Sequence, residues 1–149
     1  VVEVEGPQGE FILHEKSERP LYFFAFDGGF APIKSLVEHA MSLEVEHIHL
    51  HWIASAPARL YLPNVGRAWG DALDNFHYSE YTTGFDLRVS NVKRESQLLH
   101  HLQEMAGADP EMTLADVYLA GPEASIVVAE KFFIGQGMPK SRVFVEVVS

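Results

Sequence analysis

The chain has 149 residues, of which 47% are hydrophobic and 21% are charged, the balance of an ordinary globular domain. It contains no cysteine, so disulfides, thiolate-bound zinc and a cysteine-held iron–sulfur cluster are excluded within this segment. Eleven basic against 21 acidic residues give a net charge of −10, which argues against a nucleic-acid partner. No apolar stretch has the roughly 18 residues of a membrane helix and no export signal is visible, so we expect a cytoplasmic protein without a membrane contact.

The first fifteen residues differ in pattern from the rest of the chain. Two short strand-like pieces, Val1–Glu5 and Phe11–His14, flank the turn-forming residues Gly6–Gly9. No repeat, low-complexity segment or long linker follows. The remainder is therefore predicted to form one continuous unit.

From Leu21 onward, strand-like and helix-like segments alternate. Leu21–Phe26 is a continuous apolar run, which is typical of a strand buried on both faces. Asp27, Gly28 and Gly29 interrupt this run, and a helix follows with Pro32 in its first turn. The apolar residues that share one face of this helix are Ile33, Leu36, Val37, Ala40 and Met41.

The later elements continue the alternation. We expect strands at His47–Ile53, Asn75–Thr83, Ala115–Ala120 and Arg142–Val147, and helices at Ala58–Leu73, at Glu95–Ala106 and from Gly121 to about Gly135. This pattern predicts an α/β fold, a doubly wound five-stranded parallel sheet in the order 3-2-1-4-5 with helices on both faces. Ligands of such sheets lie beyond the carboxyl ends of the strands, where the winding reverses. The turns after the first and fourth of these strands therefore meet at one crevice.

These two turns contain the first candidate binding residues. Gly28 and Gly29 would let backbone N–H groups approach a pyrophosphate, and the helix that follows adds a favourable dipole. Gly121, Pro122 and Glu123 form the second turn, where glycine would admit a ligand such as a nicotinamide ring. Each turn alone is better explained as a simple strand-to-helix connection, so only their pairing favours a dinucleotide.

A row of histidines suggests a second class of site. His47, His49 and His51 alternate along one predicted strand, so their side chains point to one face. Imidazoles spaced in this way can hold zinc, copper or nickel. No nearby cysteine or carboxylate completes a ligand set, so we expect no metal and predict histidines packed beneath a helix or at its edge. No Gly-x-Ser-x-Gly turn is present, and no catalytic side chain is predicted.

Several segments together resemble the ferredoxin-NADP⁺ reductase-like family, most closely its oxygenase-reductase and deoxysugar-reductase branch. The resemblance covers nearly the whole chain in the family's order, which makes it more specific than any single motif. The matching segments are Gly6–Phe11, Arg19–Leu21, Gly29–Ser35, His51-Trp52, Leu60–Leu62, Asp116–Pro122 and Arg142–Glu146.

The resemblance implies that residues 1–18 end a flavin-binding barrel and that residues 19–149 form the NAD(P)-binding domain. NADH would bind across the two turns, FAD in the neighbouring domain would accept its hydride, and electrons would pass to an iron–sulfur domain or another protein acceptor. With most of the barrel absent, we expect this chain not to oxidise NADH alone. The residues implied in cofactor binding are Gly28, Gly29, Phe30, Ala31, Pro32, Trp52, Ser79, Glu80, Gly121, Pro122 and Glu123.

The same residues depart from the family pattern. The phosphate turn reads Phe-Asp-Gly-Gly where Gly-Gly-Thr-Gly is expected, so Asp27 brings a negative charge and Gly28 lacks a hydroxyl. Ser55 stands where the family tends to have arginine, and Ala120 replaces a cysteine. Glu80 would repel a 2′-phosphate, which favours NADH over NADPH. These departures leave open a second interpretation, a non-catalytic relative that serves as an interaction or regulatory module.

Overall fold

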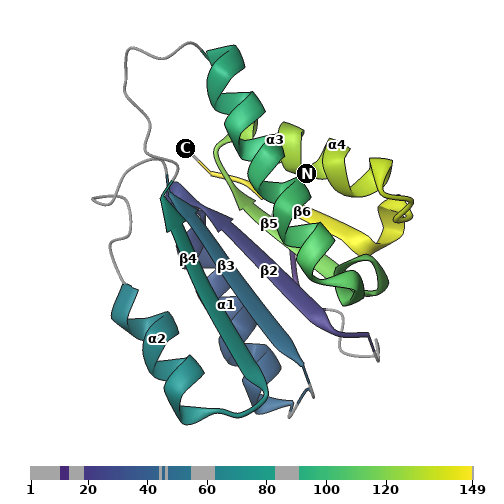
Figure 1. The fold of residues 1–149 in the computed structure, drawn as a ribbon. Helices are drawn as coiled ribbons and strands as arrows, with labels where there is room; N and C mark the ends of the chain where they lie inside the picture. The colour runs from purple at the N-terminus through teal and green to yellow at the C-terminus, as the bar shows by residue number, and fades with distance from the viewer. Residues whose placement is uncertain are drawn as a thin grey trace, which may run out of the picture.

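The structure is a computed structural model, and it describes residues 11–13, 19–43, 45, 47–54, 63–82 and 91–148. Over these residues a five-stranded sheet lies between two layers of helices (Figure 1). The strands are arranged in the order β4-β3-β2-β5-β6. In chain order this is 3-2-1-4-5, so the predicted doubly wound sheet is confirmed.

All neighbouring strands are parallel. The predicted ends of the strands agree with the structure to within one residue. β2 is the central strand and β5 lies beside it, and both are buried along their whole length, as the continuous apolar run of β2 predicted. The strands are β2 (Leu21–Phe26), β3 (Ile48–Ala54), β4 (Phe76–Thr82), β5 (Asp116–Gly121) and β6 (Val143–Val147).

The helices cover both faces of the sheet, with α1 and α2 on one face and α3 and α4 on the other (Figure 1). They are α1 (Phe30–Ser42), α2 (Pro63–Ala72), α3 (Asn91–Ala108) and α4 (Glu123–Gly135), with short 3-10 helices η2 (Asp27–Gly29), η4 (Pro110–Leu114) and η5 (Lys140–Arg142). α3 begins four residues earlier than predicted because its polar first turn has no apolar periodicity. The part of the second predicted helix before Pro63 lies outside the described residues. No described helix is long and apolar enough to cross a membrane.

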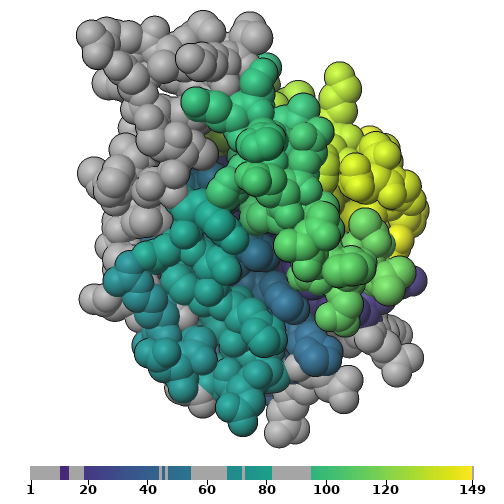
Figure 2. Space-filling model, viewed as in Figure 1, coloured from purple at the N-terminus to yellow at the C-terminus, as the bar shows by residue number. Residues whose placement is uncertain are grey.

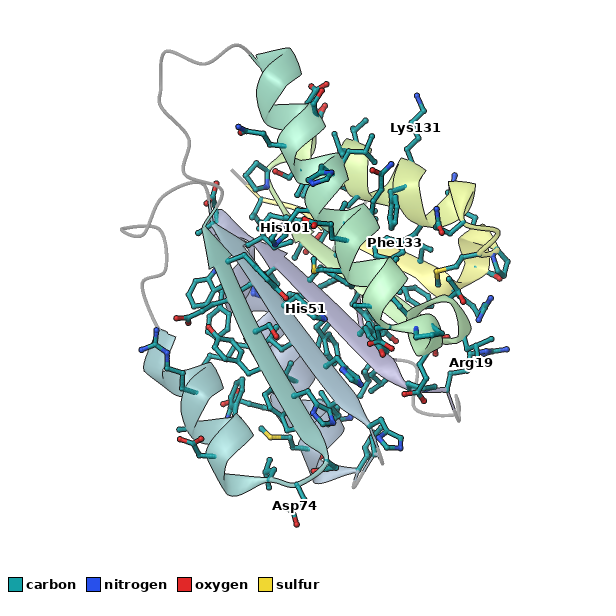
Figure 3. The ribbon with its side chains drawn as sticks, viewed as in Figure 1. Arg19, His51, Asp74, His101, Lys131 and Phe133 are labelled. Carbon is teal, nitrogen blue, oxygen red and sulfur yellow. The ribbon has the colours of Figure 1, made fainter. Side chains whose placement is uncertain are left out.

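The sheet separates two apolar cores. One lies beneath α3 and α4 and includes Leu102 and Phe133, the latter labelled in Figure 3. The other lies beneath α1 and includes Ile33. Phe11 and Leu13 also belong to this second core, although they precede the first strand of the sheet. The described part of the segment assigned to the barrel therefore packs against the sheet and α1.

Candidate functional site

The two glycine-bearing turns lie against each other at the carboxyl edge of the sheet. β2 and β5 are neighbours, and Ala25 pairs with Ala120. A Cβ atom added to Gly29 would lie 1.9 Å from the carbonyl oxygen of Ala120. A Cβ atom added to Gly121 would lie 2.6 Å from the Cβ atom of Phe26. The turn after β2 therefore packs against the end of β5, and the turn after β5 packs against the end of β2. The structure thus brings together the two turns that the strand order predicted to meet.

Protein atoms rather than a ligand explain two of the glycines. Close approach of a helix to a strand is a recognised role of glycine in nucleotide-binding turns, and Gly29 and Gly121 are both buried in this way. Gly28, by contrast, is exposed, as is Ala31, while Phe30 is fully buried. A ligand approaching the first turn from outside would therefore meet Gly28 and Ala31.

The first turn holds a strained residue at the start of α1. Asp27 has φ 49°, the one positive φ among the described residues other than glycine. Aspartate tolerates this left-handed conformation better than most side chains. No side chain caps α1, whose positive dipole end points to this edge and favours an anion. The carboxylate of Asp27 opposes that preference.

The second turn carries its own acidic group. β5 ends at Gly121, Pro122 occupies the N-cap of α4, and no side chain caps this helix either. Glu123 is exposed in the first turn of α4, where a carboxylate interacts favourably with the helix dipole. Glu123 therefore competes electrostatically with any anion bound between the two turns.

The structure adds one carboxyl group that the sequence analysis did not single out. Glu146 of β6 pairs with Ala120, and the next residue, Val147, pairs with Gly121. Burial raises the pKa of Glu146, so this carboxyl holds its proton more readily than an exposed glutamate. The sequence could have indicated Glu146, because it lies in the last predicted strand and the predicted strand order places that strand beside the one ending near Gly121.

Trp52 supports the first turn from inside the domain. Its side chain is fully buried and stacks on Phe30, with ring centroids 4.0 Å apart and ring planes 8° apart. Its indole N–H donates a hydrogen bond of 3.0 Å to the backbone oxygen of Asp27. The structure thus places this predicted binding residue under the turn and away from solvent.

Ser79 and Glu80 lie on β4, two strands away from β2 in the sheet. As neighbours in a strand, they point to opposite faces. The carboxylate of Glu80 forms an ion pair with Arg67 of α2 and accepts a 2.8 Å hydrogen bond from the Tyr78 hydroxyl. Burial, and secondarily this hydrogen bond, raise the pKa of Tyr78. The charge expected to repel a 2′-phosphate is therefore balanced by a guanidinium. Ser55 lies outside the described residues.

The predicted histidine row lies on the face of the sheet that α3 covers. The rings of Tyr22, His49 and His77 stack across three neighbouring strands, with centroids 4.2 and 4.6 Å apart. His51 stands near the middle of the sheet and His101 on the helix in front of it (Figure 3). Atoms of β3 form the bottom of a hollow between β4 and α3 (Figure 2).

Burial favours the neutral ring at three of the histidines, His49, His51 and His101. Both ring nitrogens of His51 and the Nε2 atoms of His49 and His101 are buried without a hydrogen-bond partner. Burial lowers the pKa of His51 to about 4 and also lowers the pKa values of His49 and His101. Within the described ranges, no three histidine or carboxylate side chains come together as a metal site.

Comparison with known proteins finds relatives that are reductases. No family model matches the chain. Over 145 residues the chain is 30% identical to the CDP-6-deoxy-L-threo-D-glycero-4-hexulose-3-dehydrase reductase of Yersinia pestis, a match that covers 97% of the chain and 42% of that relative. Further relatives are named as a flavin reductase and as reductase components of oxygenases. These relatives are reductases, consistent with the resemblance to the ferredoxin-NADP⁺ reductase-like family drawn from the sequence.

Solved structures of this family share the fold. The cytochrome P450 reductase GcoB of Amycolatopsis aligns with a TM-score of 0.67 at 17% identity, over 97% of the chain and 40% of the reductase. The ferredoxin-NADP⁺ reductase of Plasmodium falciparum aligns with a TM-score of 0.66 at 12% identity, over 88% of the chain and 54% of that protein. At these identities the likeness supports the fold alone.

The family resemblance drawn from the sequence is thus confirmed for the branch as well, because a deoxysugar reductase is among the relatives. The chain spans about two fifths of the length of this relative. The reductase-like domain described above is therefore one part of such a protein's length.

Proposed function

We propose that this chain is the pyridine-nucleotide-binding unit of an NAD(P)H-dependent flavin oxidoreductase. The observation that carries the proposal is the contact between the Asp27–Gly29 turn and the Gly121-Pro122 turn at the switch point of the sheet. Two helices, α1 and α4, begin at this edge without side-chain caps, which suits the phosphates of a dinucleotide. The chain's similarity to reductases supports the same assignment.

Each turn has a separate role in this proposal. Gly28 and Ala31, the exposed residues of the first turn, contact the pyrophosphate, while Phe30 and Pro32 shape the start of α1. Gly121, Pro122 and Glu123 face the nicotinamide end. When bound, NADH supplies a hydride to FAD in a neighbouring domain, which passes electrons to an iron–sulfur or other protein acceptor. The cytoplasmic location expected from the sequence also stays a prediction.

The preference for NADH over NADPH rests on Glu80. Its carboxylate lies on the face of the sheet that α1 covers, because it follows Tyr78 at a spacing of two residues and Tyr78 packs against that core. A 2′-phosphate near Glu80 would meet a negative charge that Arg67 only balances and does not reverse. We therefore expect tighter binding of NADH than of NADPH, by a smaller factor than an unpaired carboxylate would give.

Calorimetric titration of the chain with ADP-ribose, NADH and NADPH tests the proposal. ADP-ribose lacks the nicotinamide, so its binding does not require the flavin. Gly28→Glu places a carboxylate at an exposed position whose φ is not positive, and we expect it to abolish binding without unfolding the chain. Ser35→Glu, an equal charge change at an exposed position within α1 and beyond its first turn, is the matched control.

Gly29 is unsuitable for this test because any side chain there would collide with the backbone of Ala120 and disturb the fold itself. The absence of heat with all three ligands, at protein concentrations near one millimolar, would contradict the proposal. So would equal binding by Gly28→Glu and the wild-type chain.

The alternative function is that of a non-catalytic relative. The observation that favours it is that protein atoms fill the space beside both buried glycines while Asp27 and Glu123 add negative charge to the crevice. Under this alternative the domain keeps its fold for interaction or regulation. The same titration separates the two, since only the reductase function requires nucleotide binding.

A further inference from the structure

We propose that Trp52 is a positioning residue that aims the backbone N–H of Gly28 in the first turn outward without touching the ligand. Its ligand is the nucleotide of the proposed function, on which this part of the inference rests. The geometry of the turn can be tested separately. The proposal assigns a role to a side chain that is fully buried.

The peptide bond between Asp27 and Gly28 sets the direction of the Gly28 N–H. The indole N–H of Trp52 donates to the carbonyl oxygen of Asp27 at 3.0 Å, so this oxygen points into the domain. No cis peptide bond occurs among the described residues, and in a trans peptide the C=O and the following N–H point in opposite directions. The N–H of Gly28 is therefore directed away from Trp52, toward the outer side of the turn, where Gly28 is exposed.

The turn needs such support because its backbone is not in a preferred conformation. Asp27 adopts φ 49°, which costs a residue other than glycine free energy unless the surroundings hold it. Trp52 holds it at two points. The hydrogen bond fixes the Asp27 carbonyl, and the ring stack with Phe30, at 4.0 Å, fixes the first residue of α1. The two contacts span the whole of η2.

The two contacts of Trp52 can be separated by substitution. Phenylalanine at position 52 keeps an aromatic ring beneath Phe30 but has no N–H to donate. Trp52→Phe should therefore release the Asp27–Gly28 peptide while leaving the apolar packing largely in place. Trp69→Phe is the matched control, since Trp69 is the chain's second tryptophan and packs edge-on against Phe76, away from the turn.

The first measurement is the dissociation constant for ADP-ribose, with thermal unfolding as a check on the fold. We expect Trp52→Phe to weaken binding by about three- to tenfold, the effect of one hydrogen bond, and Trp69→Phe to leave it unchanged. Equal binding by Trp52→Phe and the wild-type chain would overturn the proposal. If the wild-type chain itself does not bind, the proposed function fails, and the next measurement decides the inference.

The second measurement is the NMR signal and hydrogen exchange of the Gly28 amide in the ligand-free chain. We expect Trp52→Phe to shift this signal and change its exchange rate by at least several-fold, with Trp69→Phe as wild type. An unchanged Gly28 amide overturns the proposal whatever the affinity does. Should Trp52→Phe fail to fold, benzothienylalanine at position 52 keeps the two-ring shape without the N–H and answers the same question.

Discussion

Asp27 combines a negative charge with a left-handed backbone at the residue where the first turn begins. The charge opposes an anion, whereas the conformation shapes the turn that would bind it. Asparagine separates the two properties because it has nearly the same shape and also tolerates a positive φ. The two effects can therefore be measured one at a time.

We predict that Asp27→Asn binds ADP-ribose more tightly than the wild-type chain, by about two- to tenfold at low ionic strength, because a like charge near the pyrophosphate is removed. Isothermal titration at low and high salt checks this, and the gain should shrink as salt screens the charge. The unfolding temperature should change little. Unchanged affinity at low salt would show that the carboxylate does not act on the ligand.

Asp27→Val provides the contrast for the backbone. A β-branched side chain at φ 49° is strained, so this variant should lose about 1–2 kcal/mol of stability, measured by urea unfolding. Equal stability of Asp27→Asn and Asp27→Val would mean that the turn relaxes to another conformation.

At the scale of elements, the seam between α3 and the sheet is built from imidazole rings held neutral. Burial, and secondarily the neighbouring His49 and His101, lower the pKa of His51 from 6.5 to about 4. The carboxylate of Asp109, which accepts a hydrogen bond from Tyr22, acts in the opposite direction but more weakly. The stability of the packing between α3 and the sheet therefore depends on pH.

The folded chain should lose stability as the pH falls from 6.5 to 4, because the unfolded chain then binds protons at His51 that the folded chain excludes. This one group contributes no pH dependence above 6.5 and up to roughly 3 kcal/mol of destabilisation by pH 4. Urea unfolding at a series of pH values should therefore show a shallower acid decline for His51→Phe, which keeps the ring stack on Phe24.

His100→Gln is the control for this series, since His100 is exposed on α3, the helix that packs over this face of the sheet, and pairs with Glu104. Its acid decline should follow that of the wild-type chain. If His51→Phe and the wild-type chain decline in parallel, the imidazole of His51 reaches solvent when protonated and the seam is not sensitive to acid.

Most of the element pattern could be predicted from the sequence, and the errors have physical causes. The apolar run of β2 marked a central strand, and regular alternation gave the strand order. The polar first turn of α3 carries no periodicity, so the start of this helix was placed too late.

Trp52 was expected to face the nucleotide, yet it lies on the same face of β3 as the buried residues Ile48 and Leu50. The alternation of side chains along β3 therefore already indicated that Trp52 points into the core and not toward a ligand.

At the scale of the whole molecule, the segment before the sheet contributes to the core beneath α1. Phe11 is 8% exposed and contacts Tyr118 edge-to-face, with ring centroids 6.1 Å apart. Sequence periodicity could not reveal this because the contact joins residues far apart in the chain. It bears directly on the domain boundary expected after residue 18.

We predict that Phe11→Ala lowers the free energy of unfolding by about 3 kcal/mol, as expected for loss of a buried aromatic ring. Ile12→Ala is the matched control, because Ile12 is 58% exposed and should change stability by no more than about 0.5 kcal/mol. Urea unfolding followed by tryptophan fluorescence measures both. Similar values for the two variants would place the first segment outside the core of this domain.

The close packing of Gly29 and Gly121 against opposite strand ends has a consequence for how the sequences of related proteins diverge. Each glycine is required by the backbone of the opposite strand end, so selection for folding alone would retain both. A lineage that abandoned its coenzyme would keep this pair and would first change exposed positions such as Gly28. Across related sequences, invariance at positions 29 and 121 therefore traces ancestry, and variation at position 28 is the better indicator of whether chemistry has been kept.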